Sequence, residues 1–187
     1  DAQLPAEERG IQRFEKMVSG KYLGELLRVV LQDVIGQDRP LRTALDTPGS
    51  LPTSLMSEIE QAFSEQGHEA VARLLETRLS LQQGDVSTEE AQVAVQLSTT
   101  VSTRAAHLIA SALAATVRLV DPEFTRPHTV AVDGSVFEHY WSMPQRIQEG
   151  LRLLLGDAAE HIHLKLVRDG SGVGAAIAAA IATTPPR

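Results

Sequence analysis

Two short turns of nearly the same sequence are the segments of this chain best suited to bind a ligand. Asp133-Gly134-Ser135 follows the β-branched run His128–Val132, and Asp169-Gly-Ser-Gly172 follows the alternating run His161–Val167. A glycine-rich turn between the end of a strand and a helix exposes backbone N–H groups that can bind phosphate oxygens. Neither turn matches the Walker A loop or the dinucleotide pattern G-x-G-x-x-G. The turns indicate a phosphate or nucleotide site, although DGS after a strand is also a good turn sequence without any ligand.

A pair of histidines, His161 and His163, is the other group whose spacing could serve chemistry. On a strand this spacing places both imidazoles on one face, where they could bind a metal ion. Metal sites need three or four converging ligands, and the sequence offers no third ligand nearby. The pattern therefore favours two half-exposed strand residues.

A single carboxylate, Glu15, stands between Phe14 and Met17 and close to the pair Ser19-Gly20. On a helix it could pair with a cation one turn away, or it could accept hydrogen bonds from a polar ligand. Its residue type and spacing leave both roles open.

The last third of the chain must position the two turns. It reads as a strand at His128–Val132, a helix at Met143–Leu155, a strand at His161–Val167 and a helix at Gly174–Ala182. This order is a βαβα unit, which implies parallel strands joined by a right-handed crossover. The predicted fold is α/β, a parallel or mixed sheet flanked by helices. In such sheets ligands bind at the carboxyl ends of the strands, where both turns lie.

The preceding two thirds read as helices separated by polar breaks. Apolar spacing predicts a helix over Gln12–Leu31 that is interrupted at Ser19-Gly20, and a loop follows from Gly36 to Pro52. Thr53 or Ser54 is expected to cap a helix over about Leu55–Ser64.

A longer helix is predicted further along. Ser87 and Glu90 have the spacing of a capping box, so a helix should begin there and continue to Val120. The polar run Ser98-Thr-Thr100 is a candidate break within it.

Composition narrows the function classes. The chain has 187 residues, 43% of them hydrophobic, a net charge of −7 and no cysteine. A chain of this size and hydrophobic content can bury a core as a single domain over residues 1–187. Its net negative charge argues against a general nucleic-acid binder, which needs clustered Lys and Arg side chains. The absence of cysteine excludes disulfides, thiolate zinc sites and a cysteine nucleophile. The charged N-terminal residues and the short apolar run Ala175–Ala182 predict no membrane segment and a cytoplasmic location.

A resemblance to a known family rests on several blocks in order. The first is Gln12-Arg-Phe-Glu-Lys-Met-Val-Ser-Gly-Lys-Tyr-Leu-Gly-Glu-Leu-Leu-Arg28, which is similar to a stretch of the hexokinase/glucokinase family. The later blocks are Thr53-Ser54, Val101-Ser-Thr-Arg-Ala-Ala-His107, Val130-Ala-Val-Asp-Gly-Ser-Val136 and Asp169-Gly-Ser-Gly-Val-Gly-Ala-Ala176. From about Leu4 to Ala182 the chain thus resembles the large lobe of a hexokinase. Its sequence in these blocks looks closest to that of fungal glucokinases. The resemblance implies the fold of the actin-like ATPase superfamily.

The resemblance also implies site residues. Gln12 and Glu15 match hexose-binding positions, and a carboxylate suits paired sugar hydroxyls because it accepts hydrogen bonds on two oxygens. The positions that match the ATP site are Gly20, Lys21, Thr53, Ser57, Asp133, Gly134, Ser135, Val136 and His139.

The resemblance implies that the parent protein is a hexokinase. Such an enzyme uses ATP and Mg²⁺ to phosphorylate glucose at its 6-hydroxyl, the first step of glycolysis. The family's catalytic base and small lobe precede the position of Asp1, so the 187 residues alone are expected to be inactive. Trp141 and Ser142, the loop Gly36–Pro52 and the stretch Glu65–Ser87 depart from the family pattern. An inactive, sugar-sensing relative is the alternative.

Overall fold

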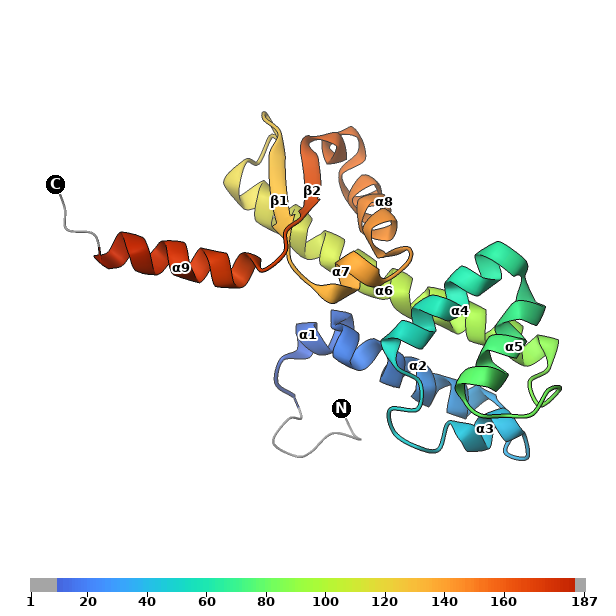
Figure 1. Ribbon diagram of the computed structural model, residues 1–187. Coiled ribbons are helices and arrows are strands. Elements are labelled where there is room, and N and C mark those ends of the chain that lie inside the picture. The colour runs from blue at the N-terminus through green and yellow to red at the C-terminus, as the bar shows by residue number, and fades with distance from the viewer. Residues whose placement is uncertain (1–9, 184–187) are drawn as a thin grey trace. The chain divides into compact units, whose positions relative to one another are not determined.

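The computed structural model describes residues 10–183, so the first residues of the predicted family match, from Leu4, lie outside the described part. The chain divides into two compact units, the first ending at Ile109 and the second beginning at Ala110 (Figure 1). Each unit is described by itself below. The expectation that residues 1–187 form a single domain stays a prediction.

Helices make up the first unit. They are α1 (Arg13–Val18), α2 (Gly20–Val34), α3 (Pro40–Ala44), α4 (Thr53–Gln66), α5 (His68–Arg78) and the first part of α6 (Thr88–Val120). Its core contains fully buried side chains from α2, the loop after α3, and α4, among them Leu23, Leu27, Leu45, Leu51 and Ile59. Burial of an apolar stripe on each helix is what stabilises such helices against the entropy of the chain.

Local signals placed several of these helices correctly. Ser19 ends α1 and begins α2, where its hydroxyl accepts a hydrogen bond from the Lys21 N–H. The predicted capping box is confirmed, because the Ser87 N–H donates to the Glu90 carboxylate at 2.8 Å and the Glu90 N–H donates to the Ser87 hydroxyl at 3.2 Å. The Arg39 guanidinium binds both Glu90 oxygens and, as the largest cause, lowers the pKa of that carboxyl.

Two expectations for the first unit were wrong, and one open alternative is decided. The segment Gly36–Pro52 contains α3, because Pro40 occupies a first-turn position where its missing N–H costs nothing. The predicted helix to Val120 is confirmed as α6, and the candidate break at Ser98-Thr-Thr100 does not interrupt it. Helix α4 begins at Thr53 with no side-chain cap, since the Thr53 hydroxyl bonds elsewhere.

The second unit confirms the predicted parallel strand pair. Strands β1 (His128–Val132) and β2 (Ile162–Leu166) run parallel, with Val130 opposite Leu164 (Figure 1). Between them lie α7 (Ser135–His139), α8 (Met143–Leu155) and the 3-10 helix η2 (Gly156–His161), and α9 (Gly170–Thr183) follows β2. One face of α8 is buried through Met143, Ile147 and Leu151. The α/β class predicted from the sequence is therefore confirmed.

The histidine pair does not lie on one strand face. His161 ends η2 and is half-buried, and the exposed His163 is the one that lies on β2. Within residues 10–183 no cluster of three or more histidine or acidic side chains could hold a metal ion. The interpretation of this pair as ordinary structural residues is favoured.

Candidate functional site

The junction between α2 and α4 brings together two of the residues predicted to face a nucleotide. The Thr53 hydroxyl donates to the Gly20 carbonyl oxygen at 2.6 Å and accepts from the Gly24 N–H at 2.8 Å. Gly20 and Gly24 are the pair whose backbone groups would close the first turn of α2. The hydroxyl of α4 thus bridges the first turn of α2 and fixes the two helix N-termini side by side.

Gly24 makes this close approach feasible. A Cβ built on it would lie 2.5 Å from both the Pro52 carbonyl carbon and the Thr53 nitrogen. Real Cβ atoms do not approach backbone atoms so closely, so only glycine fits here. The glycine of the family block G-E-L-L-R is therefore required by packing.

The remaining nucleotide-side residues of the first unit differ in exposure. Lys21 is exposed, with its ammonium 5.1 Å from the centre of the Tyr22 ring. Ser57, one turn after Thr53 in α4, is only 8% exposed. The Thr53 hydroxyl has already given its single proton to Gly20. The groups at this junction that could donate to a phosphate include the backbone N–H groups of the first turn of α4 and the Lys21 ammonium.

The two predicted sugar ligands lie one turn apart at the start of α1. Gln12 immediately precedes the helix with a left-handed backbone, φ 48° and ψ 39°, and Glu15 lies in its first turn. Both side chains are exposed, and neither is hydrogen-bonded or ion-paired to another described side chain. Their oxygens, and the Gln12 amide N–H groups, are of the types that bind hydroxyl groups.

In the second unit the two Asp-Gly-Ser segments meet at one edge of the sheet, as the sequence predicted. The predicted turn Asp169–Gly172 is shorter than expected, because α9 begins at Gly170 and not at Gly174. Beyond the last paired residues, the Val167 N–H donates to the Val132 carbonyl oxygen at 2.9 Å. A Cβ built on Gly170 would lie 3.5 Å from Asp133 Oδ2, so the second turn packs against the first. This edge is the carboxyl end of both strands, the usual ligand-binding edge of an open α/β sheet.

The first turn leads straight into α7, a helix that the sequence analysis did not predict. Gly134 has φ 156° and ψ 140°, a conformation that favours glycine, and no atom lies within 4 Å of a Cβ built there. Ser135 begins the helix, and His139 at its end is largely exposed. The Arg168 guanidinium, next to the second turn, forms a 2.7 Å ion pair with Glu138 of α7. The exposed backbone at Gly134 thus precedes a short helix that is held by the Arg168–Glu138 ion pair.

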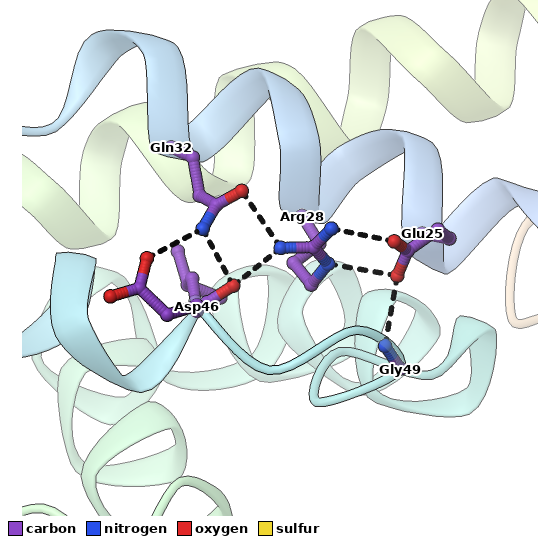
Figure 2. A network of polar contacts seen from close by, with 6 residues as sticks. Glu25, Arg28, Gln32, Asp46 and Gly49 are labelled. Carbon is purple, nitrogen blue, oxygen red and sulfur yellow. Dashed lines mark hydrogen bonds and ion pairs between the residues drawn. The ribbon is translucent and has the colours of Figure 1, made fainter. Parts of the chain in front are cut away.

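A buried polar network missed by the sequence analysis supports the α2–α4 junction (Figure 2). The Arg28 guanidinium donates to both Glu25 oxygens at 2.6 and 2.8 Å and to the Leu45 carbonyl oxygen at 2.5 Å. Glu25 also accepts from the Gly49 N–H at 2.9 Å. The hydrogen bonds from Arg28 are the main cause that lowers the pKa of Glu25, with the Gly49 N–H contributing. Both residues stand in the quoted G-E-L-L-R block, which was the available signal.

Asp121 organises the connection from α6 to β1. Its carboxylate accepts from His128 Nε2 at 2.9 Å, from the Thr125 hydroxyl at 3.2 Å and from the Arg126 N–H at 3.3 Å. These bonds, that of His128 foremost, lower the pKa of Asp121 from 3.8 to about 2. The folded state therefore favours the ionised form of this side chain.

This lowered pKa predicts a defined acid sensitivity. The contribution of Asp121 to stability is fully present above its ordinary pKa of 3.8 and is lost as the pH falls toward the folded value of about 2. We expect Asp121→Asn to melt at a lower temperature than the unaltered chain at pH 6. The gap in melting temperature should close between pH 4 and pH 2, as followed by circular dichroism. A gap that stays constant down to pH 2 would contradict this role.

A hollow of about 550 Å³ lies elsewhere in the second unit. It is lined by Phe137, Pro144, Gln145, Gln148, Arg152, Glu160, Ile162, His163 and Leu164. None of the predicted site residues lines it.

Among residues 10–183, no helix combines the length and the hydropathy needed to cross a bilayer.

Comparison with known proteins gives a consistent family. A sequence model of the hexokinase family matches residues 1–181. The chain is 34% identical over 182 residues to Hexokinase-1 of Oryza sativa subsp. japonica, covering 91% of this chain and 36% of the relative. It is 35% identical over 191 residues to Glucokinase-1 of Saccharomyces cerevisiae, covering 92% of this chain and 37% of the relative. The chain spans just over a third of the length of these relatives.

Solved structures agree in fold. A crystal structure of a hexokinase matches with a TM-score of 0.77 at 30% identity, over 89% of this chain and 36% of the other. A hexokinase from Schistosoma mansoni complexed with glucose matches with a TM-score of 0.73 at 27% identity, over 90% of this chain and 37% of the other. These likenesses bear out the α/β, actin-like ATPase fold that the sequence resemblance implied.

Proposed function

Because the chain belongs to the hexokinase family, we propose that it forms part of an ATP-dependent hexose kinase that phosphorylates glucose at the 6-hydroxyl. The observation that carries this proposal is the family match over residues 1–181, which includes every predicted site residue. Since the chain covers 36% of a typical relative, the proposal concerns the whole protein that carries it.

The turn at Asp133-Gly134-Ser135 fits a nucleotide phosphate. Gly134 leaves open space beside the backbone, and the first N–H groups of α7 have no acceptor within that helix. In this family ATP carries Mg²⁺, which neutralises charge on the phosphates and is commonly held by the phosphates, water and few protein ligands. A site without a dedicated acidic cage is compatible with that mode of binding.

Each unit contributes named residues to the proposal. In the second unit we assign Asp133, Gly134, Ser135 and Val136 to the nucleotide phosphates, and His139 to the adenosine side. In the first unit we assign Gly20, Lys21, Thr53 and Ser57 to the nucleotide. Thr53 acts there through its backbone N–H, because its hydroxyl proton is bonded to Gly20. Donors held in place before the ligand arrives do not have to be ordered during binding, which favours affinity.

Gln12 and Glu15 are proposed to hold the hexose. The Glu15 carboxylate accepts from sugar hydroxyls, and the Gln12 amide can both donate and accept. Neither is proposed as the base that removes a proton from the 6-hydroxyl. We expect that base, and the small lobe that closes over the sugar and excludes water, to come from the remainder of the protein. We propose that the protein acts in the cytoplasm.

The test is kinetic and uses the full-length protein that carries this chain. We expect Mg²⁺- and ATP-dependent formation of glucose 6-phosphate, measured by a coupled dehydrogenase assay. Glu15→Ala should raise the KM for glucose about tenfold, because a hydrogen bond to a charged group is lost, and should leave the KM for ATP unchanged. Glu69→Ala removes another exposed helical carboxylate and should change neither value.

Two results would count against the proposal. A folded protein that binds glucose and ATP without forming product would instead favour the sugar-sensing alternative. A Glu15→Ala variant with an unchanged glucose KM would remove Glu15 from the sugar site.

A further inference from the structure

Residues on one face of α2 contact the segment between α3 and α4, residues 45–52, along its length. Arg28 and Gln32 both donate to the Leu45 carbonyl oxygen, at 2.5 and 2.8 Å, where the segment begins. Glu25 binds the Gly49 N–H at its middle. At its end Gly24 packs against the backbone from Leu51 to Thr53.

Arg28 is the centre of this arrangement (Figure 2). Its side chain is 3% exposed, and its guanidinium donates to both Glu25 oxygens, to the Leu45 carbonyl oxygen and to the Gln32 side chain. Removing the Glu25 charge would leave the buried Arg28 guanidinium without its carboxylate partner. The arrangement needs the planar fork of arginine, because an ammonium cannot reach both carboxylate oxygens and the carbonyl in fixed directions.

The held segment runs directly into the first turn of α4, where Thr53 lies. Its two outer leucines, Leu45 and Leu51, are fully buried, so the ends of the segment are anchored in the core. The stretch from Asp46 to Ser50 between them is exposed or half-exposed. Within this stretch Glu25 binds the Gly49 N–H, and Gln32 and Arg42 bind the Asp46 carboxylate, while Arg28 binds the Leu45 carbonyl oxygen at its start.

We propose that Glu25 and Arg28 are positioning residues of the nucleotide site: by holding residues 45–52 on α2, they fix the first turn of α4 beside the first turn of α2. This inference rests on the proposed function, because it takes the N-terminal turns of these two helices as the nucleotide-facing side of the first unit. The pair acts through the backbone of the segment and touches no substrate. Its effect falls on ATP and not on glucose, because Glu15 in α1 and Gln12 just before it lie outside the network.

The test compares Arg28→Lys, Arg28→Gln and Glu25→Gln in the full-length protein. Each should raise the KM for Mg-ATP about three- to tenfold and leave the KM for glucose within about twofold. Amide exchange at Gly49 should quicken in all of them, since its acceptor is released or loosened. Arg28→Lys keeps the charge and loses the fork, so a lysine variant with the unaltered ATP value overturns the proposal.

Arg39→Lys is the matched control. Arg39 also binds both oxygens of a carboxylate, that of Glu90, and its remaining side-chain bond goes to the Asp85 carbonyl oxygen, so its guanidinium bonds lie outside α2, residues 45–52 and α4. It should alter neither KM, whatever its effect on stability. An equal change in both KM values for the Arg28 variants, or the same ATP effect in Arg39→Lys, would reduce the network to a general structural role. An unaltered protein that forms no glucose 6-phosphate refutes the proposed function itself, which is a separate outcome.

Discussion

Replacing Gly24 by alanine is expected to lower the free energy of unfolding by about 3 kcal/mol, the upper part of the usual range for overpacking a buried site. In an open helix the same change would stabilise by up to about 1 kcal/mol, because alanine is the better helix former. At Gly24 the new methyl group would meet the Leu51 oxygen, the Pro52 carbonyl carbon and the Thr53 nitrogen. These are backbone atoms and cannot rotate away, so the steric term decides the sign.

Urea denaturation followed by circular dichroism measures the effect, with Gly36→Ala as the matched control. A Cβ on Gly36 would meet only the Arg39 Cγ, at an ordinary 3.5 Å. That variant should stay within about 0.5 kcal/mol of the unaltered chain, as exposed substitutions usually do. Equal stability of the two variants would show that the junction of α2 and α4 yields without cost.

Features with a local physical cause were predictable from the sequence. The Ser19-Gly20 break, the Ser87–Glu90 capping box and the parallel strands were each predicted from residues within a few positions of one another. The meeting of the two Asp-Gly-Ser turns followed from topology, since parallel strands end at one edge. For such elements the chain's own spacing contains the necessary information.

Some helices lacked a strong local signal. Helix α5 begins after Gly67, whose φ is 81°, and has no side-chain cap that would mark its start in the sequence. Helix α7 has five residues and follows a glycine turn, which is too short for apolar periodicity to appear. His161 looked like a strand residue because alternation continues one position before β2 begins.

The support of the candidate site was the part that no local pattern could reveal. Thr53 looked like a helix cap, and the structure joins its hydroxyl to Gly20, 33 positions earlier. Glu25 and Arg28 have the i, i+3 spacing of a pair on one helix, and the structure adds Leu45 and Gly49, which no local pattern indicates. These are tertiary contacts, fixed only when α2 and α4 pack. Family resemblance named Thr53 as a ligand, and the geometry gives its hydroxyl a structural task as well.

That task predicts a clear loss for Thr53→Val, which keeps the shape of the side chain and removes the hydroxyl. The Gly20 oxygen would lose a 2.6 Å bond and the buried Gly24 N–H a 2.8 Å bond, with a methyl group wedged between them. We expect the free energy of unfolding to fall by about 2 kcal/mol, since unmade buried hydrogen bonds cost about 1–3 kcal/mol each and the helix turn can recover part by closing on itself.

Thr53→Ser is the discriminating partner, because it keeps the hydroxyl and loses only a methyl group. Urea denaturation should place serine within about 1 kcal/mol of the unaltered chain and valine clearly below it. Nucleotide affinity can be measured by calorimetry on the full-length protein. If it falls in Thr53→Val and is kept in Thr53→Ser, the hydrogen bond to Gly20 contributes both to the stability of the fold and to nucleotide binding. Valine and serine variants of equal stability would mean that the junction depends on packing at Gly24 and not on the hydroxyl.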